Sequence, residues 1–448
     1  MTVRPCTCSA SLRSTIHHPH CSIDPAQSVP FTRCTHQFAT GPPVDLLRQL
    51  HLPHHRNLPR PVATPRCEFA PVSHLRDSLS QSATAMTNLA SEGDQHPPLD
   101  LARITRAWRA FRAYRRLSLQ VFDSQALAFE HLPEDAKTLI PDVPIRLSHA
   151  AEAIEHNADV IERIAALAGI TKPFQLDALD PDDLAQTVAD FPDVVDGLIA
   201  ITRDWSAVSE KDRSLSYDHI LRAIEKAADE AVSAGTLESR DTFSVLVPGA
   251  SLGRLAWEIA NRGFVVQGVE SSYLQLFMCN YIMNGSATPE APLHLYPYAH
   301  HTGMAPSVND QCKEVEFPDT NPRQLQNPNF SMVAGEFLEL YNKEDAWDCV
   351  ATCFFVENSH SIVSYVRRIA TILKSGGVWI NHGSLDFRFD DSETEPSVEV
   401  TAEELELVIQ RAGMRIIRKE MLICKPPFAV SGMINEEYKS IFTVATRI

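Results

Sequence analysis

Phe243-Ser-Val-Leu-Val-Pro-Gly-Ala-Ser-Leu-Gly253 joins a short apolar run to a tight turn that contains glycine. The run is rich in β-branched residues and predicts a buried strand. After the turn, Leu255 and Ile259 follow helical spacing as far as Gly263, where a glycine is a natural helix end. A strand, a glycine turn and a helix N-terminus bring backbone N–H groups and the positive end of a helix dipole into one crevice. This stretch therefore predicts a binding turn for a nucleotide-like group.

The chain downstream of this turn alternates between strand-like and helix-like segments. Helices are predicted at 271–284 and 359–374, and the Pro-, His- and Asn-rich residues 285–330 have the composition of an insertion. The apolar runs that predict strands span 265–270, 331–334, 347–355, 378–382, 414–423 and 442–447. The alternation indicates an α/β fold with a doubly wound, mostly parallel sheet, and the last two runs predict a closing hairpin with an antiparallel last strand.

The chain upstream of the turn is helical in pattern over residues 99–234. Its apolar residues recur at three- and four-residue spacing, as in Leu101, Ile104, Trp108 and Phe111. Prolines at 173, 181 and 192 divide the pattern into separate helices. We therefore expect a leader at 1–95, a helical N-terminal region at 96–240 and a sheet domain at 241–448.

Residues 1–85 differ in composition from the rest of the chain. They hold five of the ten cysteines, eight of the 18 histidines and eleven of the 30 prolines, and they contain no lysine. We interpret them as a disordered leader, or as a spurious one before a second start at Met86, because they lack periodic apolar residues. A metal tract and an organelle transit peptide are the alternatives. The lone cysteines form no CxxC pair, and frequent proline disfavours a targeting helix.

The overall composition excludes several classes of function. A formal net charge of −17 argues against a nucleic-acid partner, because phosphate binding needs clustered Lys and Arg. No apolar run reaches the roughly 18 residues that span a bilayer, so we expect a soluble protein with no membrane partner. The cysteines after residue 85 are scattered, which is typical of reduced thiols and suggests neither disulfides nor a metal site. We expect a cytoplasmic location, with the nucleus, or an organelle reached through the leader, as alternatives.

Glu270 is the first acid at the end of the second predicted strand, 21 residues after Gly249. A carboxylate at this place can accept both ribose hydroxyls of a nucleotide-like cofactor. A nicotinamide dinucleotide site is disfavoured, since its G-x-G-x-x-G fingerprint needs three glycines and the turn offers only Gly249 and Gly253.

Gly249-Ala-Ser-Leu-Gly253 also matches G-x-S-x-G, the nucleophile elbow of α/β-hydrolases. Ser251 would then be the nucleophile, with Asp348 or Asp386 and His360 or His382 as partners. That fold builds several strands before its nucleophile, whereas the chain upstream of Ser251 is helical. A hydrolase is therefore the alternative and not the first choice.

The C-terminal half resembles the N2227-like family of carnosine N-methyltransferases. The resemblance covers about residues 200–448, with a weaker match in Arg203-Asp-Trp-Ser206 and Asp212-Arg213. Its longest block reads Val-Pro-Gly-Ala-Ser-Leu-Gly-Arg-Leu-Ala-Trp-Glu-Ile-Ala over 247–260. Further blocks are Gln-Gly-Val-Glu at 267–270, Phe-Pro-Asp at 317–319, Asn-Phe-Ser-Met-Val-Ala-Gly-Glu-Phe at 329–337, Trp-Asp-Cys-Val-Ala-Thr-Cys-Phe-Phe at 347–355 and Gly-Gly-Val-Trp-Ile-Asn at 376–381.

The resemblance implies a class I methyltransferase fold, which is Rossmann-like, and S-adenosylmethionine as the methyl donor. Carried over by position, the cofactor contacts fall on Glu210, Arg213, Gly249, Glu270, Glu336, Phe337 and Cys353. Arg213 would grip the methionine carboxylate of the cofactor, as a guanidinium does in bidentate pairs. Glu336 would accept from the adenine amine, and Phe337 would pack against the adenine ring.

The same resemblance implies N-methylation of an imidazole nitrogen in carnosine or a related histidine-containing small molecule or peptide. The acceptor contacts fall on Glu357, Arg388 and Tyr438. Glu357 would bind one imidazole N–H, which fixes the tautomer and leaves the other nitrogen to attack. Arg388 stands where the family has His, and we interpret it as holding an acceptor carboxylate.

Other departures from the family are smaller. Ser251 replaces a Gly, Glu210 replaces a Gln, and Glu336 and Glu357 each replace an Asp. A non-catalytic adaptor with a relic methyltransferase fold is a further alternative, against which the intact Gly249, Glu270 and Glu357 count. The oligomeric state is left open, with a homodimer as one alternative.

Overall fold

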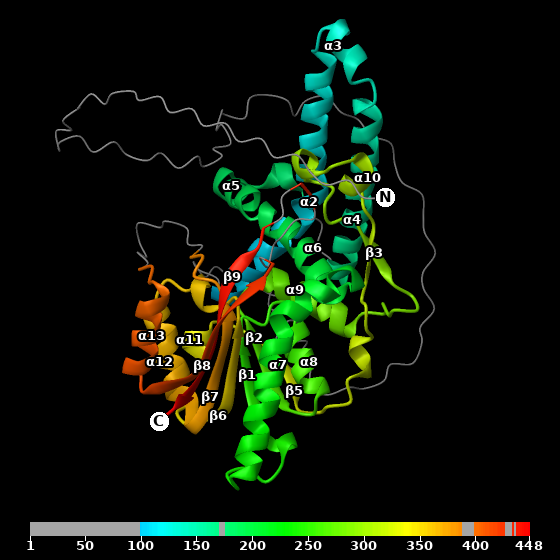
Figure 1. Cartoon of the computed structure of the whole chain (residues 1–448). Coiled ribbons are helices and arrows are strands. Elements are labelled where there is room, and N and C mark those ends of the chain that lie inside the picture. Colours follow the sequence, from blue (N-terminus) through cyan, green and yellow to red (C-terminus); the bar gives the residue numbers. More distant parts are fainter. Residues whose placement is uncertain (1–98, 170–174, 388–397, 426–431, 434–435) are drawn as a thin grey trace, which may run out of the picture. The chain divides into compact units, whose positions relative to one another are not determined.

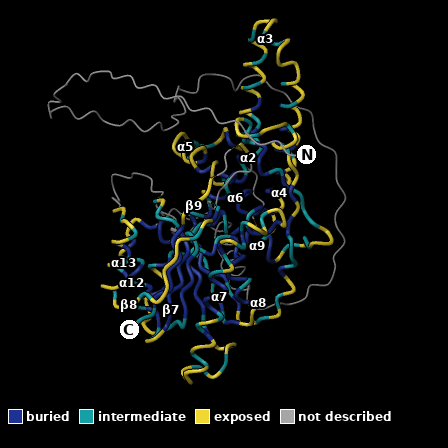
Figure 2. Tube along the Cα trace, in the orientation of Figure 1, coloured by how far each residue is buried: buried dark blue, intermediate teal, exposed yellow. Residues whose placement is uncertain are grey.

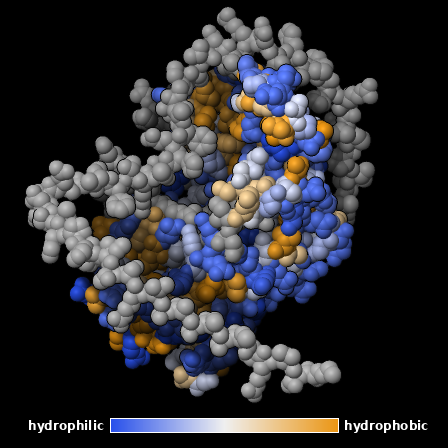
Figure 3. Space-filling view, turned by 45° about the horizontal axis from the view of Figure 1, so that its top comes forward, coloured by the Kyte–Doolittle hydropathy of each residue, from blue (hydrophilic) through white to orange (hydrophobic). Residues whose placement is uncertain are grey.

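The computed structural model describes residues 99–169, 175–387, 398–425, 432–433 and 436–448. These residues belong to one compact unit of the chain, Cys67–Ile448. The predicted leader at 1–95 lies outside the described residues. Within them, no helix is both long and apolar enough to cross a membrane. Figure 3 shows hydrophilic residues over much of the described surface on one face, with hydrophobic residues in separate patches between them.

A seven-stranded sheet forms the centre of the structure (Figure 1). Its strand order is β5-β2-β1-β6-β7-β9-β8, and β9 runs antiparallel to both of its neighbours. The other pairs in the sheet are parallel. The strands are β1 (Ser244–Pro248), β2 (Val265–Glu270), β5 (Phe330–Ala334), β6 (Trp347–Cys353), β7 (Leu373–Gly383), β8 (Met414–Cys424) and β9 (Tyr438–Arg447). This arrangement confirms the predicted α/β fold and its antiparallel closing strand, and it is the class I methyltransferase topology.

Helices cover both faces of the central strands, whose successive side chains point to opposite sides, whereas the edge strand β8 is largely exposed. In β1, Val245 and Val247 join one hydrophobic cluster and Leu246 joins another. Helices α11 (Phe337–Leu340), α12 (Ile362–Ile372) and α13 (Ala402–Arg411) cover the face of Leu246, and the opposite face carries α7 (Glu210–Ser233), α8 (Arg254–Asn261) and α9 (Tyr273–Asn284). Figure 2 shows the strands of the sheet as the main concentration of buried residues.

The helical pattern predicted for 99–234 is confirmed among the residues described there. In addition to α7, its helices are α2 (Leu99–Glu130), α3 (Glu134–Leu139), α4 (Val143–Leu167), α5 (Pro181–Ala189) and α6 (Phe191–Trp205). Pro181 and Pro192 lie in the first turns of α5 and α6, where proline costs no backbone hydrogen bond. Pro173 lies outside the described residues. Apolar residues of this region and of the sheet belong to one buried cluster.

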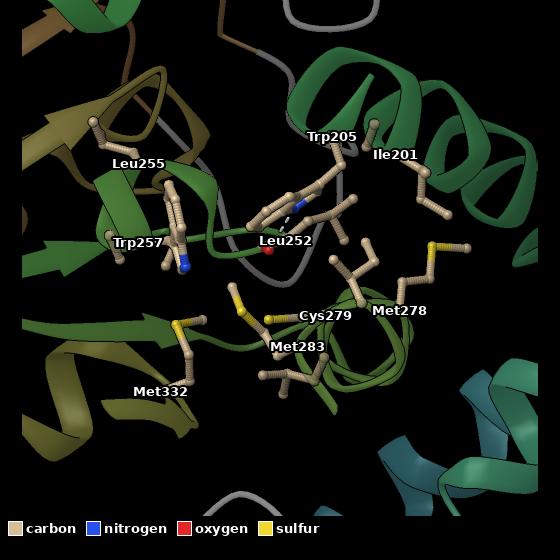
Figure 4. Packing of buried hydrophobic residues seen from close by; sticks show 14 of the residues in the cluster. Ile201, Trp205, Leu252, Leu255, Trp257, Met278, Cys279, Met283 and Met332 are labelled. Atoms are coloured by element: carbon tan, nitrogen blue, oxygen red, sulfur yellow. Dashed lines mark hydrogen bonds between the residues drawn. The ribbon is translucent and has the colours of Figure 1, made fainter. Parts of the chain in front are cut away.

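Trp205, the last residue of α6, fastens the helical region to the glycine turn. Its indole Nε1 donates to the carbonyl of Leu252 over 3.1 Å, and its ring lies against Trp257 of α8. Figure 4 shows this contact beside a group of sulfur-bearing side chains, among them Cys279 and Met283 of α9. Flexible thioethers fill irregular gaps well, so the turn is supported by close packing.

Residues 285–330, predicted as an insertion, contribute a small hairpin and an anchoring acid. The hairpin pairs β3 (Leu293–Leu295) with β4 (Val315–Phe317), and α10 (Val308–Gln311) lies between the two strands in the chain. Asp319 follows β4, and its carboxylate lies between the guanidinium groups of Arg213 and Arg254. The insertion therefore joins α7 to α8 through one shared carboxylate.

Candidate active site

A cavity of about 810 Å³ opens at the carboxyl ends of β1, β2 and β6. Ligands of open α/β sheets bind at this edge, so its position is the expected one. The predicted site residues that line it are Arg213, Gly249, Glu270, Glu336, Phe337, Cys353, Glu357 and Tyr438. Glu210 is exposed at the start of α7 and does not line the cavity. Arg388 lies outside the described residues.

The glycine turn forms one wall, and Gly249 is required there for two reasons. Its φ of +64° is a left-handed conformation that glycine adopts without strain, and an added Cβ would lie 2.4 Å from the ring of Phe355. Ser251 has a φ of +51°, which is unusual for a residue with a side chain. The turn that the sequence predicted as a binding turn thus lines the cavity with an unusual backbone conformation.

Glu270 ends β2 beside this turn and is already surrounded by hydrogen-bond donors. One carboxylate oxygen accepts from the backbone N–H of Ser251 at 2.9 Å, and the other accepts from Ser271 and Ser272 at 2.8 and 2.9 Å. Burial raises the pKa of the Glu270 carboxyl group, although the three N–H groups act in the opposite direction. The arrangement holds a fixed acceptor at the edge of the cavity.

Glu336 and Phe337 lie where β5 leads into α11. The side chain of Glu336 makes no cap hydrogen bond, and its carboxylate pairs with Arg103 of α2 at 3.2 Å. Phe337 is buried, with its ring edge-on to the rings of Phe355 and Tyr365. Together they offer an acidic acceptor beside an aromatic wall, which suits a flat heterocycle with an exocyclic amine.

Arg213 lines the cavity, but both terminal nitrogens of its guanidinium already donate hydrogen bonds to groups of the protein. One terminal nitrogen donates to the carbonyls of Arg203 and Ser206, and the other pairs with Asp319. In this structure Arg213 therefore holds the end of α6 in place at the cavity wall. Its predicted contact with a cofactor carboxylate stays a prediction.

Glu357, in the short helical turn Val356–Asn358, is the most unusual group in the cavity. Its side chain is buried, with the residue 3% exposed. One carboxylate oxygen accepts from the backbone N–H and the hydroxyl of Ser384, at 3.2 and 3.3 Å. The other, Oε2, is buried with no hydrogen-bond partner among the residues described. Loss of solvation raises the pKa of this carboxyl group to about 7.

Tyr438, the first residue of β9, lies on the same side of the cavity. Its hydroxyl donates to Asp386 over 2.7 Å, and both residues line the cavity together with Lys425. Cys353, at the end of β6, has a thiol whose pKa is raised by burial. A thiol that stays protonated is no nucleophile, so Cys353 contributes shape and backbone to the wall.

Three residues that shape this site have no role predicted from the sequence: Arg103, Arg203 and Asp319. Arg103 and Arg203 line the cavity, and Arg203 donates to the hydroxyl of Ser251 at 3.2 Å. Asp319, in the Phe-Pro-Asp block, anchors Arg213 of the cavity wall. The sequence shows each of them as a charged residue, but the residues around it do not indicate which distant segment it contacts.

Of the partners named for the hydrolase alternative, Asp386 and His360 line the same cavity as Ser251, and Asp386 accepts from the hydroxyl of Tyr438. The other two partners are engaged elsewhere. Asp348 lies at the start of β6, where it binds Lys374 and Ser244, far along the sheet from the turn at Ser251. Both ring nitrogens of His382 are engaged, with the carbonyl of Ser216 and the hydroxyl of Ser440. Ser251 also follows the first strand of the sheet, with helices before it.

The described part of the chain contains no recognisable metal-binding site. Over those residues, no group of three or more His, Cys, Asp or Glu side chains could hold a metal ion. Cys279, Cys312, Cys349, Cys353 and Cys424 are free thiols, as the sequence predicted for this half of the chain. The cysteines of the alternative metal tract lie outside the described residues.

Comparison with known proteins gives consistent matches. The family model described as carnosine N-methyltransferase matches residues 182–447. Carnosine N-methyltransferase of Mus musculus is 30% identical over 398 residues, covering 85% of this chain and 95% of the mouse protein. The Schizosaccharomyces pombe enzyme of that name is 31% identical, covering 69% of this chain and 86% of its own. Carnosine N-methyltransferase unmet of Drosophila melanogaster is 35% identical over 252 residues, with 55% and 53% covered.

Proposed function

The chain belongs to the carnosine N-methyltransferase family, and we propose that it methylates an imidazole nitrogen of carnosine or of a related histidine-containing molecule. It is an N-methyltransferase, and S-adenosylmethionine is its methyl donor. The alternatives of a hydrolase and of a non-catalytic adaptor have no support from the family.

The residues present fit this donor. Gly249 presents backbone without a side chain of its own in the cavity wall, and Glu270 holds a carboxylate at the end of β2 for ribose hydroxyls. Glu336 and Phe337 supply the acceptor and the aromatic wall for the adenine. When bound, S-adenosylmethionine supplies a methyl group on a positively charged sulfur, which makes that methyl group electrophilic.

The single observation that carries the acceptor assignment is the buried Oε2 of Glu357, which has no hydrogen-bond partner among the described residues. A buried carboxylate oxygen without a donor is costly, so its presence in a cavity wall suggests that a ligand supplies the donor. An imidazole N–H fits, because it is a single directional donor on a ring whose other nitrogen carries a lone pair.

The chemistry then follows from what Glu357 does to the ring. By accepting one N–H, it fixes the tautomer and directs the lone pair of the other nitrogen toward the methyl group. As the new N–C bond forms and the C–S bond breaks, the electron pair of that bond stays on sulfur and the ring becomes positive. The negative charge of Glu357 stabilises this developing charge, and the ring's N–H proton then passes to the Glu357 carboxylate, which returns it to solvent when the product leaves.

Glu357→Gln tests this proposal. The amide keeps the shape of the side chain but carries no charge, so turnover with carnosine should fall by about 100-fold or more. The affinity for S-adenosylmethionine, measured by titration calorimetry, should stay nearly constant. Glu357→Asp is the matched control, since it keeps the carboxylate and should retain much more activity than the Gln variant.

A substrate screen defines the acceptor. The wild-type protein is assayed with carnosine, with other histidine-containing dipeptides and with the same dipeptides carrying Phe in place of His. Methylation is expected in the histidine set alone. Equal turnover by wild type and Glu357→Gln, or methylation of the Phe-containing set, would show that the acceptor is not an imidazole held by Glu357.

A further inference from the structure

Arg103 brings α2, the first helix of the described residues, into the wall of the cofactor cavity. It lies in the second turn of α2 and is 233 residues away in sequence from Glu336, with which it forms an ion pair at 3.2 Å. Both residues line the cavity, and their side chains are about equally exposed, at 34% and 33%. We propose that Arg103 is a positioning residue that holds the Glu336 carboxylate ready to accept from the adenine amine of the cofactor.

Glu336 needs such a partner because its own surroundings do not fix it. It precedes the four-residue helix α11, and its side chain makes no hydrogen bond to cap that helix. Burial is the main cause of the raised pKa of Glu270, and the negative charge of Glu336, at the end of the neighbouring strand, adds to it, so the two carboxylates repel each other. A guanidinium beside Glu336 offsets this repulsion and restricts the carboxylate to one orientation.

Three other arginines of α2 form ion pairs within the helical region, unlike Arg103. Arg106, Arg109 and Arg116 pair with Asp190, Asp183 and Asp177 respectively. Those three acids all lie in or beside α5, within the helical region itself. Arg103 instead pairs with a residue on the sheet side that lines the cavity. The helical region thereby contributes a charged group to the cofactor site.

Arg103 therefore acts on the cofactor through Glu336. Its removal should lower both the affinity for the cofactor and the preference for adenine over other bases. If Arg103 orients Glu336 toward an exocyclic amine, the protein should prefer an adenine to a hypoxanthine, which has a carbonyl in that place. A purely structural role would weaken both ligands alike. The inference rests on the proposed cofactor contact of Glu336, but its test needs no acceptor, so a wrong acceptor assignment would not affect it.

The experiment measures binding of S-adenosylhomocysteine and S-inosylhomocysteine by titration calorimetry to the full chain. Arg103→Ala should raise the Kd of S-adenosylhomocysteine about two- to fivefold, the scale of a partly exposed ion pair. The Kd of S-inosylhomocysteine should change less, so the preference for the adenosyl ligand falls. Arg103→Lys should recover part of it, and Arg116→Ala is the control on the same helix that should change neither Kd.

A double variant tests whether Arg103 acts through Glu336. In the Glu336→Gln background, Arg103→Ala should have little further effect on either ligand. The inference is overturned if Arg103→Ala binds both ligands as tightly as wild type, if it weakens both by the same factor, or if its effect persists undiminished beside Glu336→Gln. Melting temperatures measured in parallel identify a variant that has merely lost stability.

Discussion

The two ends of the cavity differ in how completely the protein supplies hydrogen-bond donors to a buried carboxylate. At the cofactor end, Glu270 has three backbone N–H donors on its two oxygens. At the acceptor end, Glu357 has its Ser384 contacts on one oxygen, and its second oxygen has no partner among the described residues. Burial raises the pKa of both groups, and that of Glu357 reaches about 7.

The difference indicates two kinds of preparation for a ligand. Glu270 is completed by the protein, so it is a rigid acceptor that also holds the glycine turn in shape. Glu357 is left incomplete, and in the proposed function its missing partner is the substrate. A polar group that the protein already holds in place suits a cofactor that binds in the same way in every cycle. A buried carboxylate oxygen that lacks a donor suits a ligand that supplies one directional N–H group.

Glu270→Ala should have the largest effect on the site. It removes the acceptor for ribose and also leaves three backbone N–H groups without their partner. We expect the Kd of S-adenosylmethionine to rise by at least about 100-fold and the free energy of unfolding to fall by about 2 kcal/mol. Calorimetry and thermal melting measure the two effects. Near-normal affinity would show that the rigid end of the cavity does not bind the cofactor.

Gly383→Ala should disturb the acceptor end alone. A Cβ at Gly383 would lie 2.9 and 3.1 Å from the two carboxylate oxygens of Glu357, so the carboxylate must move. Because small misplacements of a catalytic group are costly, turnover should fall about 10- to 100-fold at nearly constant cofactor affinity. Gly303→Ala is the matched control, since its Cβ would meet no atom of the described residues within 4 Å. A loss in cofactor affinity instead would mean that the two ends are not independent.

The pH dependence of stability tests the incomplete state of Glu357. Its folded pKa of about 7 lies above the ordinary value of 4.5, so its protonated form favours folding and that stability is lost as pH rises from 4.5 through 7. Glu357→Gln should therefore be more stable than wild type at pH 8, by about 2–3 kcal/mol, with the difference vanishing near pH 4.5. Melting without acceptor is the measurement, because imidazole titrates in the same range. A constant difference across this range would contradict the assignment.

Ser251 should give the smallest effect. Ser251→Gly relieves a positive φ and removes one hydrogen bond from Arg203, and these changes oppose each other. Turnover should stay within about twofold of wild type, and Ser251→Ala should also leave it largely intact. Ester hydrolysis that disappears in Ser251→Ala would restore the hydrolase alternative.

The sequence predicted what is encoded locally. The strand-turn-helix at 243–261, the acid that ends β2 and the closing hairpin all depend on neighbouring residues, and the structure has them at those places. It could not predict contacts that join distant segments, such as Arg103 with Glu336 or Asp319 with Arg213 and Arg254. Nor does any local pattern distinguish Glu357, whose significance depends on how completely the fold removes water from it.

The indole of Trp205 has a consequence for how the site comes into being. Its hydrogen bond to the carbonyl of Leu252 connects the last residue of α6 to the middle of the glycine turn. That turn therefore has this support only when the helical region is docked on the sheet. During synthesis α6 leaves the ribosome first and must wait for the turn. We expect the ability to bind cofactor to appear late in folding, together with the docking step, so that partly folded chains do not sequester the methyl donor.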